Sequence, residues 1–244
     1  MPWRLVDSDL EPPAYTAACD EAMMLARHQG IIPNSLHFYR RATPTVSIGY
    51  FEKVEEVVDR EEMRRRGISL VRRVSGGSAI FTDRGQLIYS VILDSRSLPE
   101  SPGATFKLIC EGVIRALELL NVPAEFKPVN DILVSGRKIS GSAQTRKWDV
   151  VLQHGTLMVD TDFEAMFAVL KPGKKGRTRD SVTSLANELD PIPSMDRVKR
   201  AVVDGFSSTF DVEIVKGALT GYEDRMIERL RKEKYELERY NFRA

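Results

Sequence analysis

The chain has 244 residues and a formal net charge of +1, with 42% hydrophobic and 29% charged residues. This composition is typical of a soluble globular protein, and the near-neutral balance gives no general attraction to nucleic acid. The sequence lacks a run of eighteen apolar residues that could span a bilayer, and its acidic start, MPWRLVDSDLEPP, is unlike a signal peptide. We therefore expect a cytoplasmic protein without membrane or nucleic-acid partners.

Helical and extended patterns alternate along the chain without an internal repeat or a low-complexity linker. The predicted helices cover 15–28, 54–67 (ended by Gly67), 106–120, 194–206 (with Ser194 as N-cap) and 221–240. The predicted strands cover 35–40, 45–50, 68–74, 86–93, a hairpin over 131–144 that turns at Ser135-Gly136, and 148–159, which is either a strand pair or one long bent strand. The pattern predicts one α/β domain over 1–244.

The stretch RRVSGGSAIF, residues 72–81, places two glycines directly after two arginines and before a strand. Glycine lets backbone amides approach a ligand closely, and a neighbouring guanidinium binds carboxylate or phosphate. An anion-binding turn built by Arg72 and Arg73 is one interpretation. A simple β-turn with solvated arginines is the other.

A second polar stretch, NDILVSGRKISGSAQ, carries Asn130, Asp131 and Lys138 and then a run of small residues. Strand alternation sends Lys138 to the face opposite Ile139, where the small residues leave room for a ligand. The alternative is an ordinary exposed hairpin lysine.

Other candidate positions are less specific. His154 precedes Gly155 in an apolar run and is either a core histidine or a site residue. The basic loop KPGKKGRTR, 171–179, is either solvated or closes over a triphosphate, and it does not match a Walker A loop. Cys19 and Cys110 lie in predicted helices outside any metal-binding or disulfide pattern, so we expect no metal site of the protein's own.

Six stretches in order, DEAMM, RRVSGGSAIF, LIYSV, NDILVSGRKISGSAQ, HGTLMV and SVTSL, resemble the biotin/lipoate A/B protein ligase superfamily, and within it lipoate-protein ligase A. The resemblance runs from Trp3 to Leu185. It implies an α+β domain with a mixed β-sheet and flanking helices. It also implies an enzyme that uses ATP and Mg²⁺ to convert lipoate or octanoate into an acyl adenylate. The acyl group then passes to a lysine of a lipoyl carrier domain, such as a 2-oxoacid dehydrogenase E2 or the glycine cleavage H protein.

The resemblance assigns Lys138 as the catalytic residue, in contact with both the carboxyl and phosphate oxygens. It assigns the following positions to lipoate and ATP binding: Arg73, Ser75, Gly76, Gly77, Ser78, Ala79, Asn130, Asp131, Lys138, Ser140, Ala143, His154 and Gly155.

The chain departs from the ligase pattern at Ser78, where a third glycine is usual, and at Thr82, where a histidine is usual. LIYSV and GSAQTR also resemble the octanoyltransferases of the same superfamily, which need no ATP and carry the acyl group on a cysteine before the GRK strand. Here that region, FKPVNDILV, has no cysteine. Octanoyl or lipoyl transfer between carriers remains the alternative, and a protein that only binds an acyl chain is a third.

Familiar ligases continue into a small accessory domain, whereas this sequence stops at a stretch, KYELERYNF, that resembles the end of the large domain. We therefore expect either that a separate small accessory subunit supplies this domain or that the chain alone carries out only part of the reaction.

Overall fold

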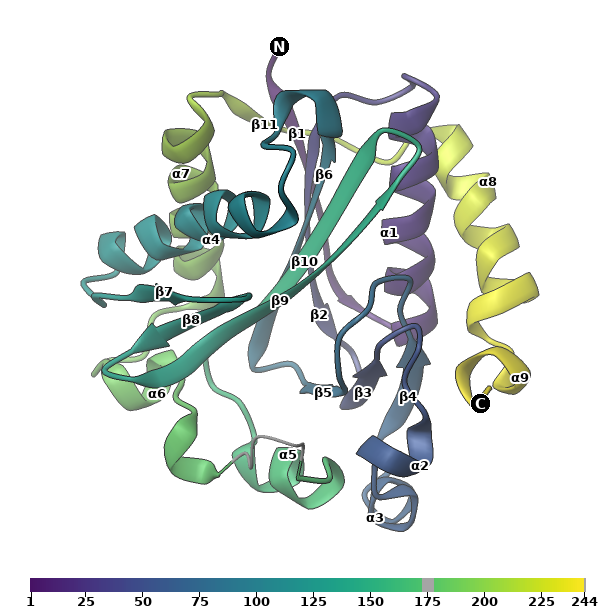
Figure 1. The fold of residues 1–244 in the computed structure, drawn as a ribbon, viewed down its shortest axis with the longest axis vertical. Coiled ribbons are helices and arrows are strands. Elements are labelled where there is room, and N and C mark those ends of the chain that lie inside the picture. The colour runs from purple at the N-terminus through teal and green to yellow at the C-terminus, as the bar shows by residue number, and fades with distance from the viewer. Residues whose placement is uncertain (173–177, 244) are drawn as a thin grey trace.

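A computed structural model describes residues 1–172 and 178–243 of the protein. Its largest element is an eight-stranded mixed sheet with the strand order β11-β1-β2-β6-β10-β9-β8-β7 (Figure 1). The strands are β1 (Trp3–Glu11), β2 (Ser35–Arg41), β6 (Gln86–Asp94), β7 (Glu125–Lys127), β8 (Asp131–Val134), β9 (Arg137–Lys147), β10 (Val150–Met158) and β11 (Ile214–Lys216). β1 runs parallel to β2 and β11, and the other neighbouring pairs are antiparallel.

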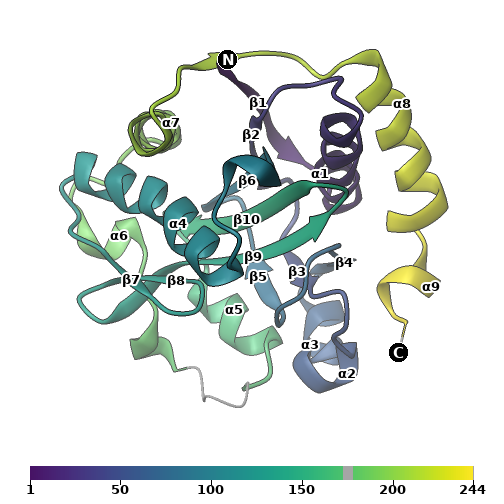
Figure 2. The same ribbon diagram turned by 45° about the horizontal axis from the view of Figure 1, so that its top comes forward.

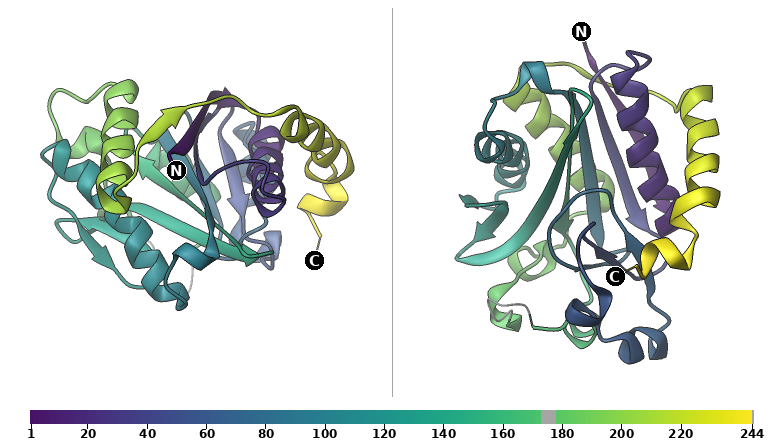
Figure 3. Two further views of the ribbon diagram at one scale, coloured as in Figure 1. Left: turned by 90° about the horizontal axis from the view of Figure 1, so that it is seen from above. Right: turned by 45° about the vertical axis from the view of Figure 1, so that its right-hand side comes forward.

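Helices cover both faces of this sheet (Figure 3). α1 (Pro13–His28) and α8 (Gly221–Leu230) pack together on one face, and α4 (Pro102–Leu119) and α7 (Met195–Phe210) pack together on the other. Each pair encloses its own apolar cluster against the sheet. The strands are therefore buried on both faces, which explains why QLIYSVIL is almost continuously apolar.

A second sheet of three short strands lies at one end of the large one (Figure 2). Its order is β4 (Ser69–Arg72), β3 (Thr45–Ile48) and β5 (Ile80–Thr82). The short helices α2 (Val54–Val57), α3 (Arg60–Arg65) and α5 (Phe163–Val169) share a third apolar cluster with it. The remaining short helices are α6 (Leu185–Glu188) and α9 (Glu238–Asn241), with 3-10 turns at Ser95–Ser97 and Arg179–Ser181.

The predicted hairpin is confirmed. Ser135 and Gly136 have φ values of 50° and 77°, the left-handed pair that a tight two-residue turn requires. Trp148 and Asp149, with φ values of 55° and 57°, make a similar turn between β9 and β10. The run 148–159 is therefore one long strand after a turn.

Two helix predictions need correction. Residues 54–67 form α2 and α3 rather than one helix, because Val58 is extended and bridges Leu170, and Asp59 starts a new helix by accepting hydrogen bonds from the Glu61 and Glu62 amides. Residues 221–240 are also interrupted. α8 continues as a π-helical stretch, Arg231–Tyr235, and α9 starts separately. The Ser194 N-cap is confirmed, although its helix runs on to Phe210.

None of the helices in the described part of the chain is both long and apolar enough to cross a membrane.

Candidate active site

A cavity of about 340 Å³ lies between the central strands of the large sheet and the loop that joins β4 to β5. Its lining combines apolar and cationic side chains: Tyr39, Arg41, Ser47, Arg73, Gly77, Ser78, Ala79, Ile80, Thr82, Ile88, Asn130, Asp131, Lys138, Gly141, Ser142, Ala143, His154, Gly155 and Thr156. This mixture suits an amphiphilic ligand with one charged end.

Strand register builds the floor of the cavity. On neighbouring strands, Gly141 pairs with Thr156, Ala143 pairs with His154, and Thr156 pairs with Ile88. Directly paired residues share a face of the sheet, so these side chains point the same way. Ile88 in turn pairs with Tyr39 on β2, which carries the floor across four adjacent strands.

The glycine loop, residues 74–79, covers this floor and depends on Gly77. Gly77 has φ +89°, and a Cβ there would lie 3.0 Å from Arg73 Nη2. Gly49, at the end of β3, makes a second close approach, because a Cβ there would lie 1.8 Å from the Gly77 carbonyl oxygen. Neither position tolerates a side chain without displacing the loop.

The Arg73 side chain holds the glycine loop in place through hydrogen bonds to its backbone. Its Nη2 donates to the Gly76 and Ser78 carbonyls, each at 2.8 Å, and its Nη1 donates to the Ser47 carbonyl at 2.8 Å. No carboxylate of the described residues pairs with this guanidinium. Burial lowers the pKa of Arg73 to about 10, so the group is still a cation at neutral pH. The cavity therefore holds a fixed positive charge.

Lys138 lies on β9 at the other side of the cavity, where its Nζ is 2.5 Å from Asp131 Oδ1 on β8. Gly141 leaves the space for this pair, because a Cβ there would lie 2.5 Å from Lys138 Nζ. About a third of each side chain is exposed, so the pair can exchange partners when an anionic ligand enters.

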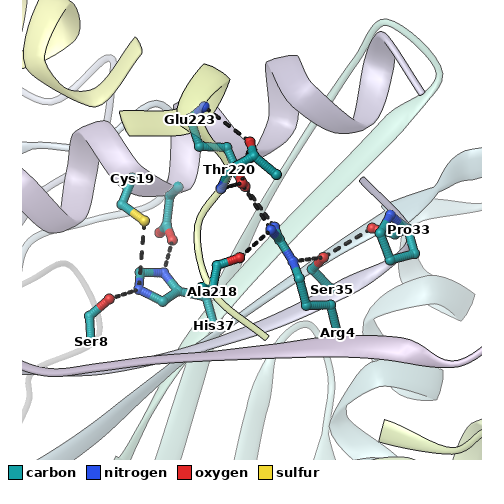
Figure 4. A network of polar contacts seen from close by, with 10 residues as sticks. Arg4, Ser8, Cys19, Pro33, Ser35, His37, Ala218, Thr220 and Glu223 are labelled. Carbon is teal, nitrogen blue, oxygen red and sulfur yellow. Dashed lines mark hydrogen bonds and ion pairs between the residues drawn. The ribbon is translucent and has the colours of Figure 1, made fainter. Parts of the chain in front are cut away.

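Asp20 of α1 is the centre of a buried polar network. It accepts hydrogen bonds from Ser90 Oγ at 2.8 Å and, through separate oxygens, contacts His37 Nδ1 at 2.9 Å and His154 Nδ1 at 3.2 Å. Burial favours the neutral acid, but the two histidines outweigh it and lower the pKa of Asp20. Figure 4 shows the other contacts of His37, which reach Ser8 and Cys19.

The opposite ring nitrogen of His154, Nε2, lies 2.6 Å from Ser75 Oγ, which also accepts from Arg73 Nε. Asp20, His154 and Ser75 thus follow the order of a catalytic triad. However, Ser75 is fully buried and does not line the cavity. The arrangement therefore holds the glycine loop on the sheet and does not present a nucleophile.

Most of the predicted site residues converge on this one cavity. Those that line it are Arg73, Gly77, Ser78, Ala79, Asn130, Asp131, Lys138, Ala143, His154 and Gly155. Ser75 and Gly76 belong to the covering loop and contact the site through Arg73. Ser140 is different. It pairs with Ile132 on the face that packs against α4, and it is buried away from the cavity.

Arg72, which we expected beside Arg73 in the anion site, points elsewhere. Its guanidinium donates to the carbonyls of Gly49, Tyr50, Glu52, Tyr240, Asn241 and Arg243. It therefore fastens the C-terminal segment to the loop after β3. Consecutive strand residues face opposite ways, and this separates the roles of the two arginines. The 171–179 loop falls largely on 173–177, outside the described residues.

Sequence reasoning missed Tyr39, Arg41 and Ile88 as lining residues. The signal for Tyr39 and Arg41 was present in SLHFYRR, where apolar Leu36 and Phe38 alternate with His37, Tyr39 and Arg41. The side chains of His37, Tyr39 and Arg41 lie on the face of β2 that is turned toward the cavity and α1. Because β2 is distant in sequence from the glycine loop, only the fold brings them together.

Both cysteines lie outside the cavity. Burial is the main effect that raises the pKa of Cys110 to about 11, which disfavours the thiolate. Cys19 is fully buried inside α1. Among the described residues, no three acidic, histidine or cysteine side chains lie together in a way that could hold a metal ion.

Residues 12–207 match the model of the lipoyl protein ligase A/B catalytic domain, which covers the whole site described above. The chain belongs to this family. It is an enzyme of the lipoate ligase and transferase group, and its mixed sheet with flanking helices is the fold expected from the resemblance. Biotin protein ligase from Aquifex aeolicus shares the fold alone, with a TM-score of 0.52 and 12% identity over 94% of this chain and 76% of its own.

Relatives within the family carry two kinds of name. The octanoyltransferase LipM of Halalkalibacterium halodurans is 32% identical over 99% of each chain. A crystal structure of lipoate-protein ligase A bound with ATP has a TM-score of 0.90 and 31% identity over 99% of each chain. A bi-partite lipoate protein ligase from Thermoplasma acidophilum, studied with its E2 lipoyl domain, has a TM-score of 0.89 and 30% identity over 99% of this chain and 96% of its own.

Proposed function

We propose that this family member activates lipoate or octanoate with ATP and transfers the acyl group to a lysine of a lipoyl carrier domain. The observation that carries the proposal is the composition of the cavity: three cations, Arg41, Arg73 and Lys138, and a glycine loop border an apolar space, and the lining residues include no thiol. Such a site suits a negatively charged acyl adenylate better than a thioester formed on the protein.

The first step brings two anions together, because a carboxylate oxygen bonds to the α-phosphorus of ATP while pyrophosphate leaves. Fixed positive charge lowers the free energy of that transition state most effectively when it needs no reorganisation. Arg73 meets this condition, since its guanidinium is already held by the Gly76 and Ser78 carbonyls of the loop and by the Ser47 carbonyl of β3. Lys138 supplies a second, more mobile charge after it leaves Asp131. Mg²⁺ would enter with ATP as part of the substrate.

In the second step, the neutral amine of the carrier lysine attacks the acyl carbonyl, a C–N bond forms, the bond between the acyl carbon and the phosphate oxygen breaks so that AMP departs, and the amine's surplus proton passes to solvent. Negative charge grows on the carbonyl oxygen during the attack. The Lys138 ammonium is positioned at the cavity edge to stabilise that charge, so it contributes to both steps without transferring a proton.

The second candidate is octanoyl transfer between carriers without ATP, and the names of curated relatives such as the LipM protein of H. halodurans favour it over ATP-dependent ligation. An acyl-cysteine mechanism needs an accessible thiolate next to the bound chain. The chain contains two cysteines, and both are buried outside the cavity. We therefore place it second.

Isotope exchange between pyrophosphate and ATP separates the two candidates. Exchange that depends on added lipoate or octanoate supports the ligase. Modification of a carrier by an octanoylated carrier protein in the absence of ATP supports the transferase.

The variants Cys19→Ser and Cys110→Ser test separately whether either thiol carries the acyl group. On the ligase proposal each keeps its turnover within about threefold, because neither thiol reacts. A thioester-linked acyl group found by mass spectrometry on either cysteine would replace the ligase proposal with the transferase.

We also propose an E2 lipoyl domain or the glycine cleavage H protein as the acceptor. The support is the T. acidophilum relative, which was studied with its E2 lipoyl domain. The same relative is bi-partite, and this supports a separate accessory subunit for the present chain.

A further inference from the structure

Arg41 is a buried cation in the cavity that the reaction above does not use. It ends β2, is 3% exposed, and lines the same cavity as Lys138 and Arg73. No carboxylate of the described residues forms an ion pair with it, including Asp20, which is engaged by His37 and His154. A buried charge without an acid partner is costly, so its position requires an explanation.

The guanidinium is held rigidly on three sides. Nε donates to Thr82 Oγ1 at 3.3 Å, Nη1 donates to Thr16 Oγ1 of α1, and the Tyr39 ring lies 5.2 Å from the guanidinium carbon. Nη2 has no hydrogen-bond partner among the described residues. One end of a preorganised donor group therefore remains available to whatever occupies the cavity.

Arg41 lies at the end of the cavity opposite Lys138. The floor crosses the adjacent strands β9, β10, β6 and β2, with Lys138 on the first and Arg41 on the last. Three strand spacings put the backbones of β9 and β2 about 14 Å apart, the scale of an extended eight-carbon acid. A void of about 20 Å³ next to Arg41 shares five lining residues with the cavity, namely Tyr39, Arg41, Ser47, Arg73 and His154, and is otherwise lined by Ala17, Asp20, Val71 and Val74.

We propose that Arg41 selects the substrate tail: its guanidinium favours an eight-carbon acid whose far end carries dithiolane sulfurs over the methyl-terminated acid of the same carbon number. This inference rests on the proposed function, which places the carboxyl group at Lys138. The disulfide sulfurs of a dithiolane are polarisable and weak hydrogen-bond acceptors, so we infer that they partly satisfy Nη2. A terminal methyl group offers that donor no acceptor.

The same geometry sets a length limit. The Arg41 side chain, held by Thr82 and Thr16, lines both the cavity and the small void, so we infer that it bounds the acyl chain at this end. Acids longer than eight carbons must displace it. A shorter or more flexible apolar side chain at position 41 should remove both the limit on acyl-chain length and the preference for lipoate over octanoate.

The test is the binding of lipoate, octanoate and decanoate to the full chain, measured by calorimetry without ATP or carrier. The wild type should bind lipoate about tenfold more tightly than octanoate, the difference expected for one additional hydrogen bond from a charged donor. Arg41→Met should reduce that ratio to within about threefold of one and improve decanoate binding. Arg41→Lys keeps the positive charge but loses the planar guanidinium with its several fixed N–H donors. It should give a lipoate-to-octanoate affinity ratio between those of the wild type and Arg41→Met.

Arg40→Met is the matched control, because Arg40 neighbours Arg41 but pairs with Asp9 on the other face of β2. It should keep the wild-type ratio. A purely structural role for Arg41 would weaken both acids equally and leave the ratio unchanged, which would overturn the inference.

The wild-type measurement needs no variant, and equal affinity or an octanoate preference there also overturns the inference. Failure of the wild type to bind any of the acids would instead contradict the acyl cavity of the proposed function itself, and the Arg41 inference would fall with it.

Discussion

At the scale of single residues, the site depends on one mobile charge and one backbone conformation. The Lys138 side chain is about a third exposed and contributes little to packing, whereas Gly77 holds a left-handed φ that other residues rarely adopt. Changes at these two positions should therefore affect ligand chemistry more than folding.

Lys138→Ala should reduce formation of acyl adenylate at least about a hundredfold, since one preorganised contact to a developing charge is worth ~3 kcal/mol. Acid-dependent pyrophosphate exchange measures this loss. Lys147→Ala, an exposed lysine on the same strand, is the control and should be near normal. Near-normal turnover by Lys138→Ala would remove this lysine from the mechanism.

Gly77→Val should abolish measurable lipoate binding, because a side chain at φ +89° strains the loop and its Cβ meets Arg73 Nη2. Gly76→Ala is the matched control, since a Cβ there meets nothing within 4 Å. Calorimetry on folded protein compares the two. Equal affinities would mean that the loop conformation has no part in binding.

At the scale of elements, α1 is joined to the sheet by charge as well as by packing. Its Asp20 carboxylate links His37 of β2 to His154 of β10, across three neighbouring strands. Burial opposes the charged form of His37, yet the Cys19 thiol and the Asp20 carboxylate raise its pKa to about 10. The network should therefore respond to pH.

The sign of that response follows from the raised pKa. A histidine that titrates near 6.5 when unfolded and near 10 when folded stabilises the fold fully below pH 6.5, and this contribution is lost as pH rises toward 10. The Tm difference between the wild type and His37→Gln should thus shrink by at least ~4 °C between pH 6.5 and 10. Thermal unfolding monitored by circular dichroism measures it. A constant difference would show that His37 is neutral in the folded protein.

At the scale of the whole molecule, the proposed reaction extends beyond one chain. The chain aligns over 99% of its length with one component of the bi-partite T. acidophilum ligase. We expect the isolated chain to transfer the acyl group from preformed lipoyl adenylate to a carrier lysine, but to form that adenylate poorly from lipoate and ATP.

Mass analysis of a carrier domain tests this expectation when lipoate plus ATP and synthetic lipoyl adenylate are supplied in parallel. A separately encoded small partner should restore the ATP-dependent step. Strong modification from lipoate and ATP without a partner would refute the need for a second subunit. Failure with the preformed adenylate would count against ligase function altogether.

The sequence by itself determined the parts that local physics controls. Apolar periodicity located the main helices and strands. The Ser-Gly dipeptide predicted the turn at 135–136, where both residues have left-handed φ values. The ordered motifs located the family and most cavity residues. It failed where tertiary contacts override local propensity, as at Val58, where a bridge to Leu170 breaks a predicted helix.

Only the tertiary structure decided which side chains share the cavity. Ser140 lies two residues from Lys138, yet a bulge at Ile139 sends it to the opposite face of the sheet. Arg72 adjoins Arg73, but its guanidinium donates hydrogen bonds to backbone carbonyls of the C-terminal segment and so points away from the cavity. Arg41, far away in sequence, completes the site. The physical reason is that strand register and long-range packing, which a linear pattern does not contain, set the direction of each side chain.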